Sequence, residues 1–489
     1  MEEVFRNIAV VWDYVMRHLL MINMLLAVII VFFQRKEPKS VWAWLLILYF
    51  LPIVGFIFYL IAGTDMYKRK KFRTKEAEDQ ISEAIREQEH SIRTKELARE
   101  RPELAGYADL VYYNLESAGA VLTGDNAVDF FTDGNEKFDA LIEDMKAAKD
   151  FIHMQYYIIK NDVLFERIRA VLEEKAREGV EVRILFDAMG CRGVKHSYWK
   201  KLREAGIQTA EFFPASLRRL HLRINYRNHR KIVVIDGKKA YLGGFNIGKE
   251  YIGLDPKFGY WRDTHLRIEG TAVLGLELRF IMDWNYTAKE NLFREEKYFV
   301  LPEKPCGNTI IQIIDSGPDT SLQNIHNNYL RLIAKAEKSI YIQTPYFVPD
   351  EAILNALIIA AYSGIDVRVM IPCKPDHPFV YWATYSYIGD LVQAGAKCYT
   401  YQNGFLHAKG LIVDEKVLCY GTANMDIRSF QLNFEVNAVI YGQQEAKKMT
   451  AVFENDLKYC KQITKDLYNR RSLLIRVKEQ FCRLLSPVL

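Results

Sequence analysis

Residues 228–246 read NHRKIVVIDGKKAYLGGFN, and residues 406–424 read LHAKGLIVDEKVLCYGTAN. Each stretch contains the pattern His-x-Lys-x4-Asp, followed by a glycine step and an asparagine. The same distance of 17 residues separates the histidine from the asparagine in both copies. One such string would be weak evidence, but two with matched surroundings are not expected by chance. The two stretches therefore predict a duplicated structure with one motif in each half.

The duplication extends upstream of the motifs. Three matching pairs occur in the same order in both halves, namely FIHMQYYIIKND (151–162) with SIYIQTPYFVPD (339–350), GVEVRILFDAMG (179–190) with GIDVRVMIPCKP (364–375), and EAGIQ (204–208) with QAGAK (393–397). Self-similarity of this kind indicates two homologous lobes. Because one motif comes from each lobe, we expect a single active site formed between them.

Short runs rich in Val, Ile and Tyr alternate with amphipathic helical stretches such as residues 163–177 and 351–362. This alternation predicts α/β lobes in which mixed sheets are covered by helices. Pro, Lys and Gly cluster at residues 302–308, where the lobe boundary is expected. The predicted lobes are residues 109–304 and 305–489, and residues 73–108, dense in Glu, Lys and Arg, predict a charged helical linker.

The first 72 residues predict an N-terminal membrane anchor with two hydrophobic segments. Residues 41–62 carry no charge and are long enough to cross about 30 Å of hydrocarbon, with Trp and Tyr near the ends. The upstream segment, about 19–33, is apolar apart from Asn23 but shorter, so it either spans or takes a re-entrant or interfacial position. Together they predict a helical hairpin.

The basic flanks predict the orientation of this anchor. Eight Lys or Arg residues lie outside the two segments, mostly in residues 68–75, against three between them. The positive-inside rule then predicts a multi-pass protein of the cell membrane with its catalytic region on the cytoplasmic side.

Composition narrows the class of protein. The net charge of +5 over 489 residues does not by itself indicate a nucleic-acid partner. The cysteines are scattered without a CxxC pair, which predicts neither a disulfide framework nor a zinc site. No cluster of His, Asp and Glu has metal-ligand spacing, so the predicted chemistry uses no metal and no cofactor.

In each motif an apolar run follows the lysine and ends at the aspartate. An Asp-Gly step after such a run favours a strand followed by a primed two-residue turn. Side chains alternate along a strand, so His229 and Lys231 are expected to share a face, while Asp236 points away and supports the turn. The second motif repeats this arrangement with His407, Lys409 and Asp414.

These residue types suit a phosphodiester substrate. A neutral imidazole can attack phosphorus, and a protonated imidazole can give a proton to the leaving oxygen. Lysines and asparagines supply donors for the non-bridging oxygens. The motif residues predicted for the catalytic site are His229, Lys231, Asp236, His407, Lys409 and Asp414, with Asn246 and Asn424 predicted to bind substrate.

Each histidine also needs a carboxylate that orients it. Glu435 lies 28 residues after His407 and is the candidate in the second lobe. The first lobe has Lys257 at the corresponding spacing, so Glu250 or Asp263 must take the role there, and we favour Asp263.

At these residues the chain resembles the phospholipase D superfamily and, within it, the bacterial cardiolipin synthases. The resemblance covers nearly the whole chain and includes GGFNIGKEYIG, WRDTHLRIEG, QTPYFVPD, GTANMDIRSFQLNFEVN and the segment VWAWLLILYFLPIVGFIFYLIAG (41–63). It implies that two phosphatidylglycerol molecules yield cardiolipin and glycerol through a phosphatidyl-histidine, with His229 as nucleophile and His407 as acid and base. Gly244 departs from the pattern, because Ser or Thr is common at this position.

The partners expected are phosphatidylglycerol and the membrane, and no nucleic acid. Basic and apolar side chains interleave from residue 217 to residue 231, which suits an anionic bilayer surface. Two other readings remain open at this point: a hydrolase, either a phospholipase or a membrane-bound nuclease, that uses the same histidines with water, and a lipid-binding scaffold with vestigial motifs. A nuclease would need a long basic groove.

Overall fold

The computed structural model describes residues 14, 18–19, 21–31, 38–53, 55, 59, 75–214, 226–320 and 322–486. The chain forms two compact units. One comprises Met1–Lys70 with Ala215–Tyr226, and the other comprises Lys71–Pro214 with Arg227–Leu489.

In the first unit, residues 21–31 are helical and α2 spans Pro38–Phe50. Asn23, the polar residue of the upstream segment, donates from Nδ2 to the carbonyl oxygens of Leu48 (3.2 Å) and Pro52 (3.1 Å). These bonds satisfy the buried amide nitrogen and join the two predicted segments as a hairpin. A small apolar cluster supports them, consisting of Ile30, Trp44, Leu48 and Tyr59.

Among the residues described here, no helix has both the length and the apolar character needed to cross a bilayer. The later part of the segment 41–62 is described only in places, and the basic flank at 68–74 lies outside the described residues. The predicted second span and the orientation therefore stay predictions.

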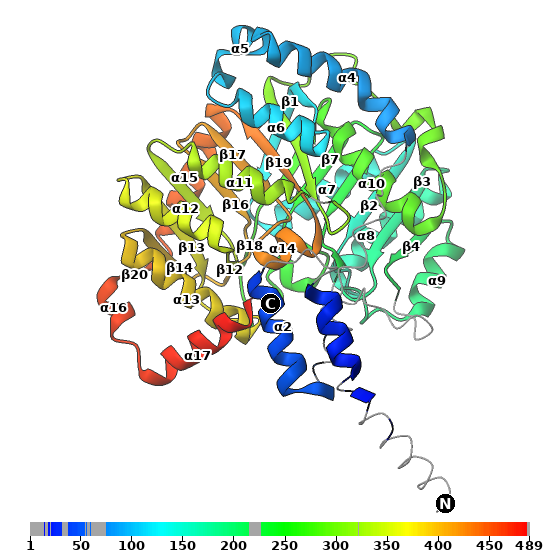
Figure 1. Cartoon of the computed structure of the whole chain (residues 1–489). Helices are drawn as coiled ribbons and strands as arrows, with labels where there is room; N and C mark the ends of the chain where they lie inside the picture. The colour runs from blue at the N-terminus through cyan, green and yellow to red at the C-terminus, as the bar shows by residue number, and fades with distance from the viewer. Residues whose placement is uncertain are drawn as a thin grey trace, which may run out of the picture. The chain divides into compact units, whose positions relative to one another are not determined.

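The second unit is built on one 16-stranded mixed sheet (Figure 1). The first lobe contributes β1 (Leu122–Phe131), β2 (Phe151–Tyr156), β3 (Glu181–Asp187), β4 (Gln208–Phe212), β6 (Ile232–Ile235), β7 (Lys239–Gly243) and β9 (His265–Glu269). The second contributes β10 (Thr309–Ser316), β11 (Ser339–Gln343), β13 (Asp366–Pro372), β14 (Lys397–Tyr401), β16 (Gly410–Val413), β17 (Val417–Gly421), β19 (Asn433–Tyr441) and β20 (Cys460–Ile463).

The strand order shows the duplication directly. It runs β1-β9-β7-β6-β2-β3-β4 in the first lobe and β10-β19-β17-β16-β11-β13-β14 in the second, with β20 added at the outer edge. Antiparallel pairing of β1 with β10 joins the two halves. The predicted fold class is confirmed, and the two mixed sheets are continuous with each other.

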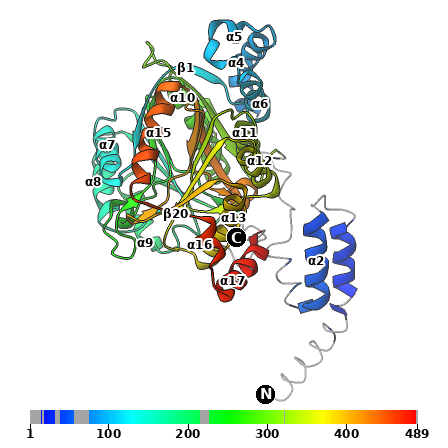
Figure 2. The ribbon, with the colours of Figure 1, turned by 90° about the vertical axis from the view of Figure 1, so that its left-hand side faces the viewer.

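Helices cover both faces of this sheet (Figures 1 and 2). They are α6 (Ala108–Ala118), α7 (Gly134–Lys146), α8 (Val163–Arg177), α9 (His196–Glu204), α10 (Ala272–Ala288), α11 (Asn324–Ala334), α12 (Glu351–Tyr362), α13 (Pro378–Ala394) and α15 (Gln443–Leu457). On the α7–α8 face of β2, Ile152, Met154 and Tyr156 join the apolar core, whereas His153 meets α10 on the opposite face.

The predicted helices at 163–177 and 351–362 are confirmed as α8 and α12. Each begins after an aspartate that stands at the same place in the repeat. Asp162 accepts hydrogen bonds from the backbone N–H groups of Leu164 and Phe165, and Asp350 accepts one from Ile353. Such N-caps satisfy amides that have no partner inside the helix.

The charged segment after residue 73 forms α4 (Lys75–Arg93) and α5 (Glu96–Glu100). It is attached to the sheet. The Gln88 side chain donates to the carbonyl oxygen of Leu122 (2.6 Å) and accepts from its N–H (2.8 Å), at the start of β1. Ile92 and Leu97 pack on the apolar core of the second lobe.

Both motif aspartates lie in hairpin turns. Asp236 and Gly237 have φ of 53° and 64°, and Asp414 and Glu415 have φ of 54° and 53°, as in a type I′ turn. Ile235 pairs with Lys239, so the connection is one residue longer than predicted. Seven residues along an extended strand correspond to roughly 20 Å, which places Asp236 far from His229.

The two aspartates also bind the start of the neighbouring strand. The Asp236 carboxylate accepts backbone N–H bonds from Lys149, Asp150 and Phe151 at 2.8–2.9 Å. The Asp414 carboxylate accepts the equivalent bonds from residues 337–339 at 2.7–2.9 Å. The geometry matches the turn role expected from the sequence.

Asp236→Ala should lower the free energy of unfolding by about 3 kcal/mol, because three N–H groups lose a charged acceptor. Denaturant unfolding of the purified protein measures this. Asp139→Ala removes an exposed ion pair to Arg167 and is the control, with an expected loss below about 1 kcal/mol. An Asp236→Ala protein of unchanged stability but without activity would instead place this carboxylate in the chemistry.

Candidate active site

Two short strand pairs cross between the lobes. β5 (Arg227–Asn228), just before the first motif, pairs with β19 of the second lobe. β15 (Phe405–Leu406), just before the second motif, pairs with β8 (Trp261–Arg262) of the first lobe. Each motif therefore starts on a strand that is hydrogen-bonded to the opposite half.

The crossing continues through the histidine backbones. The N–H of His229 donates to the carbonyl oxygen of Phe434 (2.9 Å), and the N–H of His407 donates to that of Arg262 (2.7 Å). Both acceptors directly precede a predicted orienting carboxylate. Backbone pairing thus fixes each imidazole beside a carboxylate from the other lobe.

The side chains form two crossed pairs. His229 Nδ1 lies 2.9 and 3.0 Å from the two carboxylate oxygens of Glu435, and His407 Nδ1 lies 2.5 Å from Asp263 Oδ2. Both predicted carboxylates therefore meet a motif histidine. Their assignment is exchanged with respect to the sequence analysis, which paired each carboxylate with the histidine of its own lobe.

Asp263 and Glu435 are structural equivalents. Each lies seven residues before the glycine that directly follows β9 or β19, Gly270 or Gly442. The histidine is 34 residues before the carboxylate in the first lobe and 28 in the second, so six additional residues hide the match. Lys257, at the shorter spacing, lies in this longer loop, and Glu250 forms an ion pair with Lys160 (2.5 Å) away from the histidines.

The surroundings of the two carboxylates explain Gly244. Glu435 accepts hydrogen bonds from Thr422 Oγ1 (2.6 Å) and Asn433 Nδ2 (3.2 Å). At the position equivalent to Thr422, a Cβ on Gly244 would stand 2.0 Å from Asp263 Oδ1. The shorter aspartate therefore requires glycine here, and the departure from the family pattern accompanies the change from Glu to Asp.

The motif lysines lie under the histidines and are buried. Lys231 Nζ donates to the His229 carbonyl oxygen (2.6 Å), and Lys409 Nζ to that of His407 (2.5 Å). Lys409 also acts electrostatically on both Lys231 and His229. The two motifs consequently share one buried site, in which the two lysines lie close to the two carboxylates.

Burial controls the charge of the histidines. It lowers the pKa of His229 to about 4, with Lys231 acting in the same direction and Glu435 opposing. Burial and Lys409 also lower the pKa of His407, against the effect of Asp263. Without substrate, both imidazoles are neutral at pH 7.

The lysines and carboxylates are shifted as well. Burial lowers the pKa of Lys231 to about 7 and that of Lys409 to about 8. Burial alone would raise the pKa of Glu435, but its interaction with His229 and Lys231 lowers it overall. For the pKa of Asp263, Lys409 and His407 likewise outweigh burial. Both carboxylates are therefore anionic.

The two motif asparagines differ. Asn246 Oδ1 accepts from the Ile158 N–H (3.1 Å), and its Nδ2 donates to Tyr251 Oη (3.0 Å). Asn424 is buried, and its Oδ1 has no hydrogen-bond partner among the described residues. The side chain of Asn424 hydrogen-bonds Asp426, so the atom it leaves unpaired is an acceptor, and only its Nδ2–H group could donate to a phosphate oxygen.

Aromatic rings hold the imidazoles from the side. Tyr157 contacts His229 edge-to-face with ring centroids 5.0 Å apart, and Trp261 lies 5.2 Å from His407. His265, two residues after Asp263, is fully buried in β9, and burial keeps its pKa well below the usual value. It therefore stays neutral in the core.

A buried Gln–Asp–Arg cluster lies behind each histidine, and the sequence analysis missed both. In the first, Asp283 accepts from Gln155 (2.6 Å) and from Arg230 (2.7 Å). Arg230 had been assigned to a lipid-facing basic stretch, but it is buried in this ion pair; residues 215–225 of that stretch lie outside the described residues. The glutamines at matched positions of the two repeats, 155 and 343, could have indicated these clusters.

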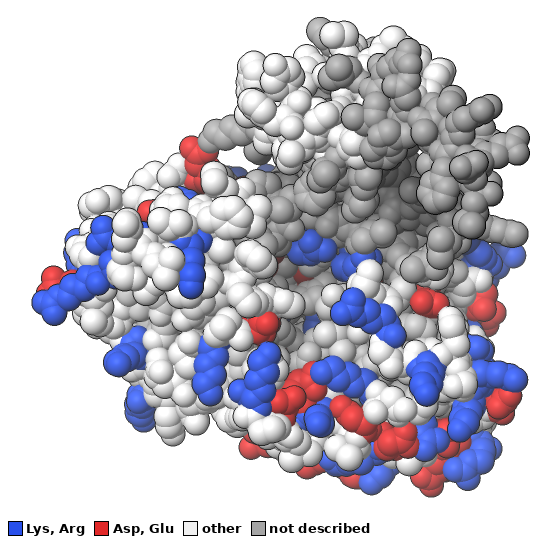
Figure 3. All heavy atoms as spheres, turned by 90° about the horizontal axis from the view of Figure 1, so that it is seen from below, with Lys and Arg blue, Asp and Glu red and all other residues white. Residues whose placement is uncertain are grey.

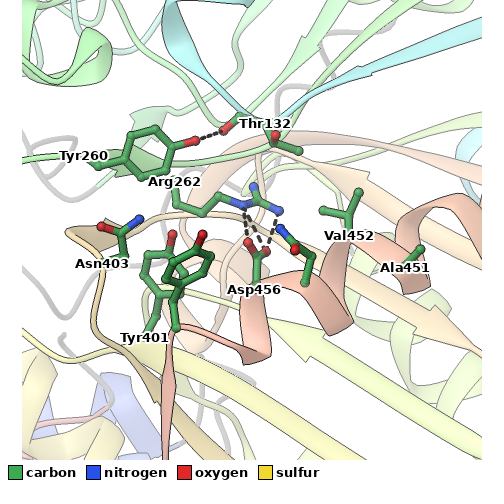
Figure 4. Close-up of a pocket in the computed structure, with 10 residues that line it drawn as sticks. Thr132, Tyr260, Arg262, Tyr401, Asn403, Ala451, Val452 and Asp456 are labelled. Carbon is green, nitrogen blue, oxygen red and sulfur yellow. Dashed lines mark hydrogen bonds and ion pairs between the residues drawn. The ribbon is translucent and has the colours of Figure 1, made fainter.

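In the second cluster, Asp456 accepts from Gln343 (2.8 Å) and from Arg262 (2.8 Å). Figure 4 shows this ion pair at the wall of a cavity of about 540 Å³, with Tyr260 and Tyr401 beside it. Arg262 precedes Asp263, so the ion pair fixes the strand that carries the carboxylate of His407.

Among the described residues, no three His, Cys, Asp or Glu side chains are grouped so that they could hold a metal ion. The polar groups that meet at the site are imidazoles, ammonium groups, carboxylates and amides. They can attack phosphorus, move a proton and bind anionic oxygens.

Comparison with known proteins identifies relatives over almost the full length. The chain is 48% identical over 469 residues to the major cardiolipin synthase ClsA of Bacillus subtilis (strain 168), covering 96% of this chain and 97% of that protein. It is 49% identical over 477 residues to a cardiolipin synthase of Listeria monocytogenes (serotype 4b, strain CLIP80459), covering 97% and 99%.

A solved structure shares the fold. It is a phosphatidylserine synthase of Haemophilus influenzae Rd KW20, with a TM-score of 0.61 and 15% identity, covering 78% of this chain and 99% of that one. Residues 22–63 match the phospholipase D-nuclease N-terminal family. Residues 141–256 and 329–457 match the family described as cardiolipin synthase, PLD-like domain. The chain therefore belongs to the cardiolipin synthase family of the phospholipase D superfamily.

Proposed function

We propose that this protein transfers a phosphatidyl group from one phosphatidylglycerol to another, giving cardiolipin and glycerol. The crossed pairs His229–Glu435 and His407–Asp263 carry the proposal, because they provide a nucleophile and a proton carrier within one buried site. Relatives named cardiolipin synthase at 48–49% identity support the same reaction.

In the first step, His229 Nε2 attacks the phosphorus of phosphatidylglycerol. Its neutral state leaves the lone pair available, and Glu435 stabilises the charge that develops on the ring through Nδ1–H. The bond from phosphorus to the headgroup glycerol oxygen breaks, and His407 donates its proton to that oxygen. Glycerol leaves, and a phosphatidyl-histidine remains.

In the second step, neutral His407 removes a proton from the headgroup hydroxyl of a second phosphatidylglycerol. The resulting oxygen attacks phosphorus, the phosphorus–nitrogen bond breaks, and His229 is restored. Cardiolipin leaves, and His407 is protonated for the next cycle. Atoms and charge balance over the two steps.

His407 must carry a proton before the first step. The bound phosphodiester is anionic, and its charge opposes the effect of Lys409, which lowers the pKa of His407 in the free protein. The same anion favours the charged forms of Lys231 and Lys409. We assign to these lysines, and to the Nδ2–H group of Asn424, the binding of the non-bridging oxygens, with Asn246 shaping the wall through Tyr251.

The membrane is the proposed location, with the catalytic lobes on the cytoplasmic side. The match of residues 22–63 to the N-terminal family supports a membrane association. Large apolar side chains are exposed on the N-terminal unit, including Met24, Trp42 and Tyr49. The basic residues at 68–75 support the orientation through the positive-inside rule.

Purified protein mixed with phosphatidylglycerol vesicles and a chelator should form cardiolipin and glycerol in equal amounts. Lipid and glycerol analysis over time measures both. A His229→Ala protein is the control and should form neither. Phosphatidic acid as the sole product would show a hydrolase, and loss of activity on chelation would show that a metal is needed.

Substrates with different leaving groups should distinguish the roles of the two orienting carboxylates. Glu435→Gln should slow transfer by roughly 100-fold or more with every substrate, because the neutral amide no longer stabilises the positive charge that develops on His229. Asp263→Asn should slow transfer from phosphatidylglycerol similarly, yet release nitrophenol rapidly from a phosphatidyl-nitrophenol analogue, which needs no proton donor. Single-turnover kinetics with both substrates measure this. Rapid release of nitrophenol by Glu435→Gln and slow release by Asp263→Asn would make His407 the nucleophile.

The pH profile should report the lowered pKa of His229. With the nitrophenol substrate, kcat/KM should hold as the pH falls through 6.5, the ordinary histidine value, and decline only near a pKa of about 4. The sign follows because the neutral imidazole is the reactive form and dominates above its pKa. Circular dichroism at each pH controls for unfolding. A decline centred near 6.5 would contradict the assignment.

A further inference from the structure

The C-terminal helix α17 (Leu473–Leu484) follows the short α16 (Lys465–Asn469) and packs along α13 (Figure 2). Its inner side carries two ion pairs and little apolar surface. Glu479 is fully buried and pairs with Arg471 (2.8 Å), and Arg483 pairs with Asp390 of α13 (2.8 Å). Cys482 is buried in the apolar core of the second lobe, and Ile475 is half-buried. The large apolar residues of the helix contribute little to holding it on the protein.

The outer side of α17 is apolar and faces solvent. Its large apolar residues retain more than half of their accessible surface: Leu473 78%, Leu474 65%, Val477 57%, Phe481 56% and Leu484 79%. At 3.6 residues per turn, they occupy an arc of about 100° on one face. A surface helix normally buries such a face against the core. In α17 the arrangement is reversed.

The charges around this face are basic. Helical geometry places Gln480 and then Arg476 beyond one edge of the apolar arc, and Lys478 beyond the other. The Arg476 guanidinium donates to the carbonyl oxygen of Asn469 (2.5 Å), and Lys478 Nζ lies 5.6 Å from the centre of the Trp382 ring. Both side chains are exposed.

The acidic residue of the helix, Glu479, is buried in its ion pair with Arg471. Figure 3 views the side on which α16 and α17 lie in Figure 1, and its left part is mainly uncharged, with Lys and Arg side chains at intervals and a few Asp and Glu side chains among them. An apolar face bordered by basic residues is complementary to an anionic bilayer surface.

We propose that α17 is an interfacial helix that lies on an anionic membrane and inserts its five exposed apolar side chains among the lipids. Arg476 and Lys478 then meet lipid phosphates at the two borders. Exposure of a long apolar face to water costs free energy. At a bilayer the same side chains exchange their contacts with water for contacts with lipid. The choice of anionic lipid agrees with the proposed substrate, and the docking itself does not require catalysis.

The contact can be measured in the full-length protein reconstituted in vesicles. A polarity-sensitive fluorophore is attached at Phe481→Cys, and the matched control carries it at Glu454→Cys on an exposed position of α15. The unmutated protein gives the background from native cysteines such as the exposed Cys306. With phosphatidylglycerol in the vesicles, the emission at 481 should shift to shorter wavelength and be quenched by lipids brominated near the headgroup. The probe at 454 should do neither.

Three results would overturn the proposal. In the first, the emission at 481 is neither shifted nor quenched by brominated lipid. In the second, it is quenched equally in pure phosphatidylcholine vesicles. In the third, it is shifted but not quenched by lipid. The first excludes membrane contact, and the second excludes the preference for anionic lipid. The third shows that protein, either a second copy or another segment of this chain, covers the face.

Charge substitutions test the consequence for turnover. Val477→Glu should reduce the rate with vesicle substrate by roughly tenfold, because a charge then lies in the apolar arc. It should not change the rate with a short-chain, monomeric phosphatidylglycerol. Gln444→Glu adds the same charge on an exposed position of α15 and is the control. Equal effects of the two substitutions would contradict insertion.

The outcome is independent of the proposed reaction. A His229→Ala protein should show the same quenching at position 481 as the parent. Lipid contact without any cardiolipin formation by the parent would refute the reaction and retain the docking. Cardiolipin formation without lipid contact at 481 would refute the docking alone.

Discussion

The hydrogen bond between a histidine of one lobe and a carboxylate of the other is the constraint on which the active site depends. His229 and Glu435 are separated by more than 200 residues in sequence, and His407 and Asp263 by more than 140. Backbone pairing of β5 with β19 and of β15 with β8 brings each pair together. Neither lobe contains a complete pair, so the duplication produced one site instead of two.

Burial makes these pairs effective. Two lysines, two histidines and two carboxylates are removed from water, where isolated charges would be costly. Each carboxylate stays ionised because a histidine and a lysine lie next to it. Each histidine stays neutral because burial disfavours its charged form and a neighbouring lysine adds to this effect. The Gln–Asp–Arg clusters behind the site keep the strands in register. In the first cluster the arginine is Arg230, which directly follows His229. In the second it is Arg262, which directly precedes Asp263.

Much of this arrangement follows from sequence. The repeated motifs, the α/β lobes, the helices α8 and α12 and the turn position of Asp236 were all predicted, because each depends on local periodicity, capping or turn chemistry. The crossed pairing was not, because sequence spacing describes contacts within a lobe and six extra residues displaced Asp263 from the expected position. The buried state of Arg230 was also missed, since its partner Asp283 lies on α10, 53 residues away. Long-range partners of this kind leave no local pattern.

The position of β19 has a consequence for the order in which the protein matures. Residues 433–441 are among the last to be synthesised, and they supply both Glu435 and the strand on which β5 pairs. A nascent chain that has completed the first lobe already contains His229, but it has no partner for the imidazole and no seam strand β10 beside β1. The site can therefore assemble only after nearly the whole polypeptide has left the ribosome. Chains truncated earlier than this strand carry the nucleophile's residue without the means to use it.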